Sequence, residues 1–179
     1  RADKLLKRLS DRLDFVIGSI HICCGGQRPS DYIFTKESYR EYFKCYFEDA
    51  KELARTSDFD VMAHLTFPFR YVPDEILREY PICGYEEDFR EIFRLLISRD
   101  KGIEINTSGL RTGLRAVMPD EQIVRWYREM GGRILTIGSD GHSAKSAGSG
   151  IIEGYGAAKR AGFEEITLFS KRVARHEKM

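Results

Sequence analysis

Short apolar runs alternate along this chain with longer stretches of helical periodicity. Strands are expected over residues 15–21, 59–64, 103–106, 134–139 and 166–169. Helices are expected over residues 2–13, 38–56, 86–99 and 150–161, and a further helix should open at Pro119 as a first-turn proline and close at Gly131–Gly132. Strands that alternate with helices predict an α/β fold with a parallel sheet and right-handed crossovers.

The helix expected over 38–56 carries an aromatic stripe whose simplest interpretation is core packing. Its aromatic positions follow helical spacing and are Tyr39, Tyr42, Phe43, Tyr46 and Phe47. Apolar residues make up 42% of the 179 residues and aromatic residues 12%, which is enough for the core of one domain. We therefore predict a single domain over residues 1–179.

Charge and hydropathy exclude two classes of partner. The chain has 29 basic and 28 acidic residues, so it lacks the basic surface that typifies nucleic-acid binding. A membrane span needs about 20 consecutive, mostly apolar residues, whereas no apolar run here exceeds three. We expect neither a nucleic-acid nor a membrane partner. The basic segment 171–179 is expected to be a solvated terminus.

The four cysteines show no CxxC pairing. They are Cys23, Cys24, Cys45 and Cys83. This usage predicts reduced thiols, no disulfide and a cytoplasmic location. The adjacent Cys23 and Cys24 suggest a metal or redox pair, but adjacent cysteines chelate poorly. A buried cysteine usually behaves as a small apolar side chain, and we favour that interpretation.

Polar residues suited to chemistry stand at the ends of the expected strands. His21 and His64 end the first two, Asn106-Thr-Ser-Gly ends the third, and Asp140 and His142 follow the fourth. The carboxyl ends of parallel strands meet at one edge of a sheet or one mouth of a barrel. We therefore expect these side chains to converge on one pocket.

Histidine and carboxylate at a shared pocket favour a metal site, because imidazole and carboxylate suit zinc, iron and related ions. In extended backbone, Asp140 and His142 point to the same side about 6–7 Å apart. That spacing suits two ions about 3.5–4 Å apart better than one. A lone histidine more often serves as a hydrogen-bonding residue, and Asn-Thr-Ser-Gly alone is an ordinary turn. Three histidines at equivalent positions, one of them beside an aspartate, favour ligation.

Arginines near these strand ends suggest an anionic substrate. They are Arg28, Arg70, Arg111 and Arg115. A guanidinium forms paired hydrogen bonds with phosphate. Metals and arginines at one pocket are typical of phosphate-ester hydrolysis, although a single exposed arginine is commonplace.

Several segments resemble, in order, the histidinol-phosphatases of the polymerase-and-histidinol-phosphatase (PHP) superfamily. They are Gly18-Ser19-Ile20-His21, Ala63-His64-Leu65, Glu104-Ile105-Asn106-Thr107-Ser108-Gly109-Leu110-Arg111, Ser139-Asp140-Gly141-His142 and Gly162-Phe163-Glu164-Glu165-Ile166-Thr167-Leu168-Phe169. The resemblance covers residues 14–172. The third and fourth segments are specific in combination.

The resemblance implies a distorted (β/α)7 TIM-like barrel with up to three divalent metals, Zn, Fe or Mn, at its C-terminal mouth. By analogy His21 and His64 bind the second metal, Asp140 the first and His142 the third. Asp140 and His142 are then the catalytic residues.

The implied reaction is hydrolysis of L-histidinol phosphate to L-histidinol and phosphate, in histidine biosynthesis. The substrate would be a small-molecule phosphate ester, and the candidate residues that contact it are Arg111, Arg70 and Asn106. Among these, Arg111 is the favoured phosphate contact.

The chain departs from the family at its start, because it carries no His-x-His strand and no bridging glutamate upstream. We expect about five β/α units of the PHP-type domain, without the N-terminal metal-binding strands. Two alternatives stay open. One is a catalytically incompetent PHP-like module with an interaction role, and the other is a PHP phosphoesterase for another small phosphate ester.

Overall fold

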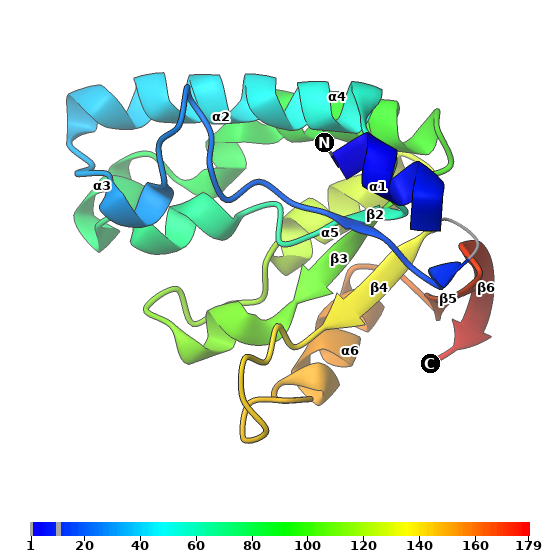
Figure 1. Cartoon of the computed structure of the whole chain (residues 1–179). Coiled ribbons are helices and arrows are strands. Elements are labelled where there is room, and N and C mark those ends of the chain that lie inside the picture. Colours follow the sequence, from blue (N-terminus) through cyan, green and yellow to red (C-terminus); the bar gives the residue numbers. More distant parts are fainter. Residues whose placement is uncertain (1, 10–11) are drawn as a thin grey trace.

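The computed structural model describes residues 2–9 and 12–179, and it has the expected alternation of strands and helices (Figure 1). The helices are α1 (Ala2–Leu9), α2 (Lys36–Thr56), α3 (Asp74–Glu79), α4 (Glu86–Ile97), α5 (Glu121–Glu129) and α6 (Ile151–Arg160). The strands are β1 (Ile17–Gly18), β2 (Val61–Met62), β3 (Gly102–Asn106), β4 (Leu135–Gly138), β5 (Glu165–Ser170) and β6 (Val173–Lys178). Part of the helix expected over 2–13 falls on residues 10–11, which lie outside the described residues.

The first four strands form one parallel sheet in the order β1-β2-β3-β4, as the alternation predicts. The register places Gly18 beside Met62, Met62 beside Ile103, and Asn106 beside Gly138. The helices pack in succession, α2 against α4, α4 against α5, and α5 against α6. All four parallel strands therefore end at the same edge of the sheet, and that edge carries the predicted site.

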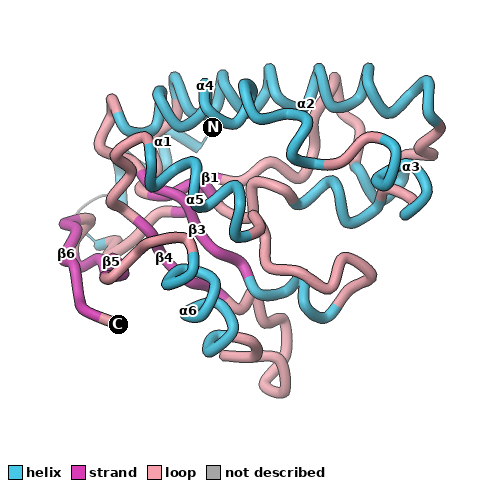
Figure 2. Tube along the Cα trace, turned by 180° about the vertical axis from the view of Figure 1, so that it is seen from behind, coloured by secondary structure: helices cyan, strands magenta, loops and turns pink. Residues whose placement is uncertain are grey.

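The C-terminal segment differs from the prediction. The fifth strand was expected in the parallel sheet, and that expectation was wrong. Residues 171–179 were expected to be a solvated terminus; residues 173–178 are exposed, but they form the strand β6, which was not expected. β5 lies beside β4 but pairs with β6 in a separate antiparallel sheet, which both views show at the C-terminal end of the chain (Figures 1 and 2). Lys171 and Arg172 make the turn with φ of 49° and 62°. Such a turn usually carries Asn-Gly, so Lys-Arg gave no hairpin signal.

Two further details were not predicted correctly. Pro119 does not open α5, because Asp120 is the N-cap and its side chain accepts a hydrogen bond from the Ile123 amide at 3.1 Å. The short helix α3 was not among the expected helices. Within the part of the chain that the structure describes, no helix has both the length and the apolar character of a membrane span.

The aromatic stripe of α2 forms the centre of the core, as predicted. All five of its aromatic side chains are buried, and the Phe43 ring stacks on Phe69 with 3.9 Å between the centroids. The buried Lys51 ammonium joins α2 to α4 through Asp88 and Glu91, each at 2.9 Å. Burial of this face fixes α2 and α4 against each other and against the loop that follows β2.

Arg172 ties the C-terminal hairpin to the start of β2. Its guanidinium donates to both Asp58 oxygens at 2.7 and 2.8 Å and to Asp60 Oδ1 at 3.0 Å. Asp60 is 7% exposed and also accepts the Val16 amide at 2.7 Å. Arg172 holds the pKa of Asp58 below its usual range through these hydrogen bonds. The hairpin is therefore anchored by a partly buried ion pair.

We expect Arg172→Ala to lower the free energy of unfolding by about 2–3 kcal/mol, because it leaves Asp60 buried without its cation. Arg175→Ala is the matched control, since Arg175 pairs with the exposed Glu177; it should cost no more than about 0.5 kcal/mol. Urea unfolding measures both. The ion pair between Asp58 and Arg172 stabilises the fold at pH values above the ordinary pKa of an aspartate. This contribution is lost as the pH falls through the lowered pKa of Asp58 in the folded protein. Equal effects of the two variants would contradict this anchoring role.

Candidate active site

A pocket of about 640 Å³ opens at the carboxyl ends of the parallel strands and collects most of the predicted site residues. Six of the seven candidates line it: His21, His64, Arg70, Asn106, Asp140 and His142. Arg111 is outside the lining. The pocket exists because β1 to β4 end side by side and polar residues stand at each strand end or within a few residues of it.

His21 and His64 form the first part of the pocket. Their ring centroids lie 4.9 Å apart, and the Phe67 ring contacts both of them. His21 is exposed, whereas His64 is 6% exposed. Burial, and next the neighbouring His21, lower the pKa of His64 to about 4. The imidazole of His64 is therefore neutral at pH 7, which is the form that binds a metal.

Asp140 and His142 form the opposite part. The Asp140 carboxylate is 30% exposed, and its Oδ1 lies 3.7 Å from His142 Nδ1. That nitrogen also lies 3.0 Å from the Asp140 carbonyl oxygen. A carbonyl only accepts, so Nδ1 carries the proton and Nε2 is left as the ligand atom of His142. The side chain of His142 is 88% exposed.

Two of the four predicted ligands have left-handed backbone conformations. His64 has φ of 31° and Asp140 has φ of 49°. Such conformations are costly for residues other than glycine and cluster at functional sites. The fold therefore maintains strained backbone at two of the strand ends that the sequence pattern identified.

Glu104 is a pocket residue that sequence reasoning missed. It is 5% exposed within β3, and Oε2 accepts the His64 amide at 3.2 Å and the Asn106 side-chain amide at 3.1 Å. Burial raises the pKa of its carboxyl group. The available signal was a charged residue inside an otherwise apolar strand, since all five residues of β3 are buried.

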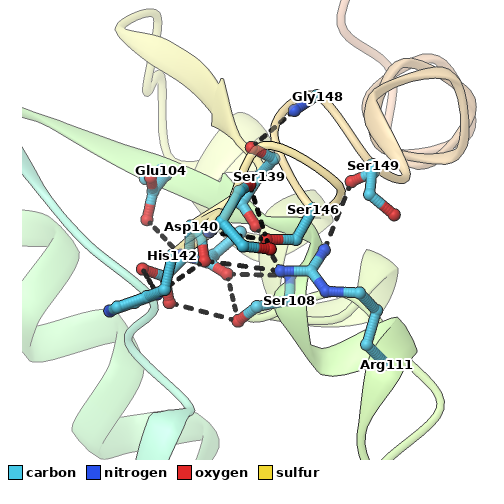
Figure 3. Close-up of polar contacts among 11 residues, drawn as sticks. Glu104, Ser108, Arg111, Ser139, Asp140, His142, Ser146, Gly148 and Ser149 are labelled. Carbon is cyan, nitrogen blue, oxygen red and sulfur yellow. Dashed lines mark hydrogen bonds and ion pairs between the residues drawn. The ribbon is translucent and has the colours of Figure 1, made fainter.

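Asn106 lines the pocket, but its side chain is engaged within the protein. Its amide donates to Glu104, and its Oδ1 accepts from the Ser108 backbone N–H at 2.9 Å. The Ser108 hydroxyl lies 2.7 Å from Asn106 Oδ1 and 3.3 Å from Asp140 Oδ2. Figure 3 shows the contact between Ser108 and Asp140. Asn106 therefore links the two carboxylates of the pocket.

The two candidate arginines have different surroundings. Arg70 lies in the pocket, 5.2 Å from the ring centroids of Phe67 and Tyr71, and it has no ion-pair partner among residues 2–9 and 12–179. Arg111 points instead to the loop after β4, where it donates to the carbonyl oxygen of Ser139 at 2.7 Å (Figure 3). A weaker contact joins Arg111 to the Ser149 carbonyl at 3.5 Å.

The donor set suits a divalent metal, because imidazole nitrogens and carboxylate oxygens are ligands of zinc, iron and manganese. The arrangement is open: in the described parts of the chain, no three of the four predicted ligands bring their ligand atoms within 4.8 Å of one another. The pocket thus brings these four donors to one opening while their ligand atoms stay separated.

Comparison with known proteins identifies close relatives. No family model matches the chain. Two curated proteins are each named "Probable histidinol-phosphatase": one from Clostridium acetobutylicum is 29% identical over 175 residues, and one from Thermotoga maritima is 31% identical over 133 residues. The first alignment covers 95% of this chain and 67% of the relative, and the second covers 74% and 54%. The chain thus spans about half to two thirds of these relatives.

A solved structure has the same fold. It is histidinol phosphate phosphatase from Lactococcus lactis, complexed with zinc, L-histidinol and phosphate. The superposition has a TM-score of 0.65 at 22% identity and covers 96% of this chain and 66% of that one.

Gly138 is expected to be essential to the pocket, because a Cβ there would lie 2.1 Å from Glu104 Oε1. Gly138→Ala should displace Glu104 from its bonds to His64 and Asn106 and lower the free energy of unfolding by about 1–3 kcal/mol. Gly113→Ala is the control, since nothing lies within 4 Å of its added Cβ. Denaturant unfolding of both variants tests this. A neutral Gly138→Ala would show that Glu104 has room to move.

Proposed function

Since this chain belongs to the histidinol-phosphatase family of the PHP superfamily, we propose that it hydrolyses L-histidinol phosphate to L-histidinol and phosphate, a step of histidine biosynthesis. The observation that supports this most directly is that one pocket holds His21, His64, Asp140, His142 and Arg70. The four free thiols fit a reducing cytoplasm, where we place the protein.

The residues that would hold the metals are His21, His64, Asp140 and His142. The metals would be Zn, Fe or Mn, with up to three ions in the intact enzyme. When bound, divalent ions neutralise charge on the phosphoryl oxygens and activate the attacking water. His64 needs no deprotonation to bind, because its burial already keeps it neutral. Glu104 receives the His64 amide and so fixes the backbone that carries this imidazole.

Arg70 is the residue that we assign to the substrate phosphate. Its guanidinium lies beside the aromatic rings of Phe67 and Tyr71, which restrict it without occupying its donors. A planar guanidinium offers paired hydrogen bonds to a phosphate group. The positive charge at the pocket therefore faces an anion rather than a carboxylate of the protein.

Arg111 has a positioning role in this proposal, in place of the phosphate contact favoured by the sequence. Its bond to the Ser139 carbonyl holds the loop whose next residue is Asp140. Asn106 is likewise assigned to positioning, because its amide and carbonyl are used by Glu104 and Ser108. Both residues then act on the reaction through the ligands that they orient.

We also propose that the sheet belongs to a distorted barrel of the PHP type. Its support is the strand order, which runs 1-2-3-4 without reversal. Right-handed crossovers along such an order place every helix on the same face, whereas an open doubly wound sheet needs a reversal. The succession of α2, α4, α5 and α6 fits helices arranged around one outer face.

The proposed reaction is tested by phosphate release from L-histidinol phosphate, measured on the intact protein with Zn²⁺ or Mn²⁺. Activity should depend on the metal, and His64→Ala should lower kcat/KM by at least about 100-fold, since loss of even a residue that only orients a metal ligand costs about 10- to 100-fold. His176→Ala is the control, because His176 lies on β6, outside the pocket. Turnover of another phosphate ester with L-histidinol phosphate inert would contradict the substrate, and no metal-dependent turnover would contradict the enzyme.

The two arginines should respond differently to substitution. Arg70→Ala should raise KM and lower kcat/KM by roughly 10- to 150-fold, because charged hydrogen bonds are worth about 1.5–3 kcal/mol. Arg70→Lys should recover part of the loss, since lysine keeps the charge without the planar fork. Arg111→Ala should lower kcat and metal retention together with little change in KM. A raised KM with unchanged metal content in Arg111→Ala would return the phosphate contact to Arg111.

A further inference from the structure

The turn that follows β1 places two thiols against helix α2. Its backbone closes between Cys23 and Gln27, whose amides each donate to the other's carbonyl at 2.9 and 2.7 Å. Cys24, Gly25 and Gly26 lie between them with φ of 52°, 76° and 116°. Cys23 is 4% exposed and Cys24 is half-buried. The tight turn therefore places the thiols of Cys23 and Cys24 next to helix α2.

Helix α2 meets this turn with further polar atoms. Tyr42, Cys45 and Asp49 are spaced by three and four residues, so they share one face of the helix. Asp49 Oδ2 accepts the Cys24 amide at 2.8 Å, and the Cys24 thiol donates to the Tyr42 carbonyl at 3.6 Å. The Tyr42 hydroxyl lies 3.0 Å from Cys23 Sγ. Two elements that are distant in sequence thus surround the thiols.

We propose that Cys23, Cys24 and Asp49 form a binding site for a thiophilic divalent cation of the zinc class, separate from the pocket at the strand ends. The ligand atoms of Cys23, Cys24 and Asp49 already lie within 4.8 Å of one another, the one such group found among residues 2–9 and 12–179.

The chemistry of the donors selects the ion. Thiolate sulfur favours zinc and softer cations over magnesium or calcium. Zn–S bonds of about 2.3 Å in tetrahedral geometry place two sulfurs about 3.8 Å apart, so the group needs to contract by at most about 1 Å. Binding transfers the thiol protons to solvent as the sulfurs become thiolates, with no oxidation or reduction.

The fold answers the objection that adjacent cysteines chelate poorly. Asp49 comes from α2, so the ligand set does not depend on the Cys23–Cys24 pair alone. An open cavity of about 610 Å³, lined in part by Cys23, Asp49 and His21, provides a path for the ion.

A bound cation would fasten the β1 turn to α2. His21 lies two residues before Cys23, so the ion would also restrict the loop that carries this histidine. The role assigned here is structural support for one wall of the neighbouring pocket.

The test is titration of the reduced protein with Cd²⁺, because cadmium–thiolate bonds have an ultraviolet charge-transfer absorption that histidine and carboxylate ligands lack. The strand-end pocket contains no cysteine in its lining, so ions bound there are silent. We expect one equivalent of Cd²⁺ to produce the band in the parent. Cys24→Ser should abolish it, and Asp49→Asn should weaken the Cd²⁺ affinity by at least roughly 10-fold.

Cys83→Ser is the matched control, since Cys83 is exposed and lies in a different segment; it should keep the band at the parent's affinity. Far-ultraviolet circular dichroism checks that each variant is folded. If Cys24→Ser does not fold, the Cd²⁺ affinity of Asp49→Asn provides the test instead. Absence of the band in the parent would overturn the site. A band lost in Cys83→Ser, or loss of two free thiols to a disulfide without Cd²⁺ binding, would overturn it as well.

Discussion

The buried carboxylate of Glu104 is the contact on which the pocket depends most. It lies inside the central strand β3, receives the His64 amide from the end of β2, and stands so close to Gly138 of β4 that no side chain fits there. Through Asn106 and Ser108 the same group is connected to Asp140. Burying a carboxyl group raises the free energy of the fold unless the group forms hydrogen bonds. The hydrogen bonds of Glu104 therefore hold these strand ends in one arrangement.

The order of the strands turns this local network into a site. Because β1 to β4 follow one another without reversal, the residues after each strand share one edge. Left-handed backbone at His64 and Asp140 turns the chain at that edge and directs the imidazole and the carboxylate into one pocket. Arg111 then secures the loop after β4 from the outside. Neutral imidazole, carboxylate and an arginine at the same pocket are what metal-assisted hydrolysis of a phosphate ester requires.

Much of this was predictable from periodicity, because it depends on local pattern. The long helix α2, the four parallel strands and the convergence of His21, His64, Asp140 and His142 all follow from where apolar runs end. The rest depends on tertiary contacts. The turn between β5 and β6 is formed by Lys171 and Arg172, which are not typical hairpin-turn residues. Arg111 follows the end of β3 in sequence, but in the structure its guanidinium donates to the Ser139 carbonyl. Glu104 was visible only as a charge within an apolar strand.

The central claim is that the pocket at the strand ends holds catalytic metal beside a phosphate. It is tested most directly by anomalous diffraction from crystals of the intact protein grown with Zn²⁺ and phosphate. The account predicts ions bonded to the His21 and His64 nitrogens and to Asp140 at about 2.0–2.2 Å, with a phosphate between them and Arg70. Ions that leave His64 and Asp140 without a metal bond, or a phosphate bound away from Arg70, would contradict it.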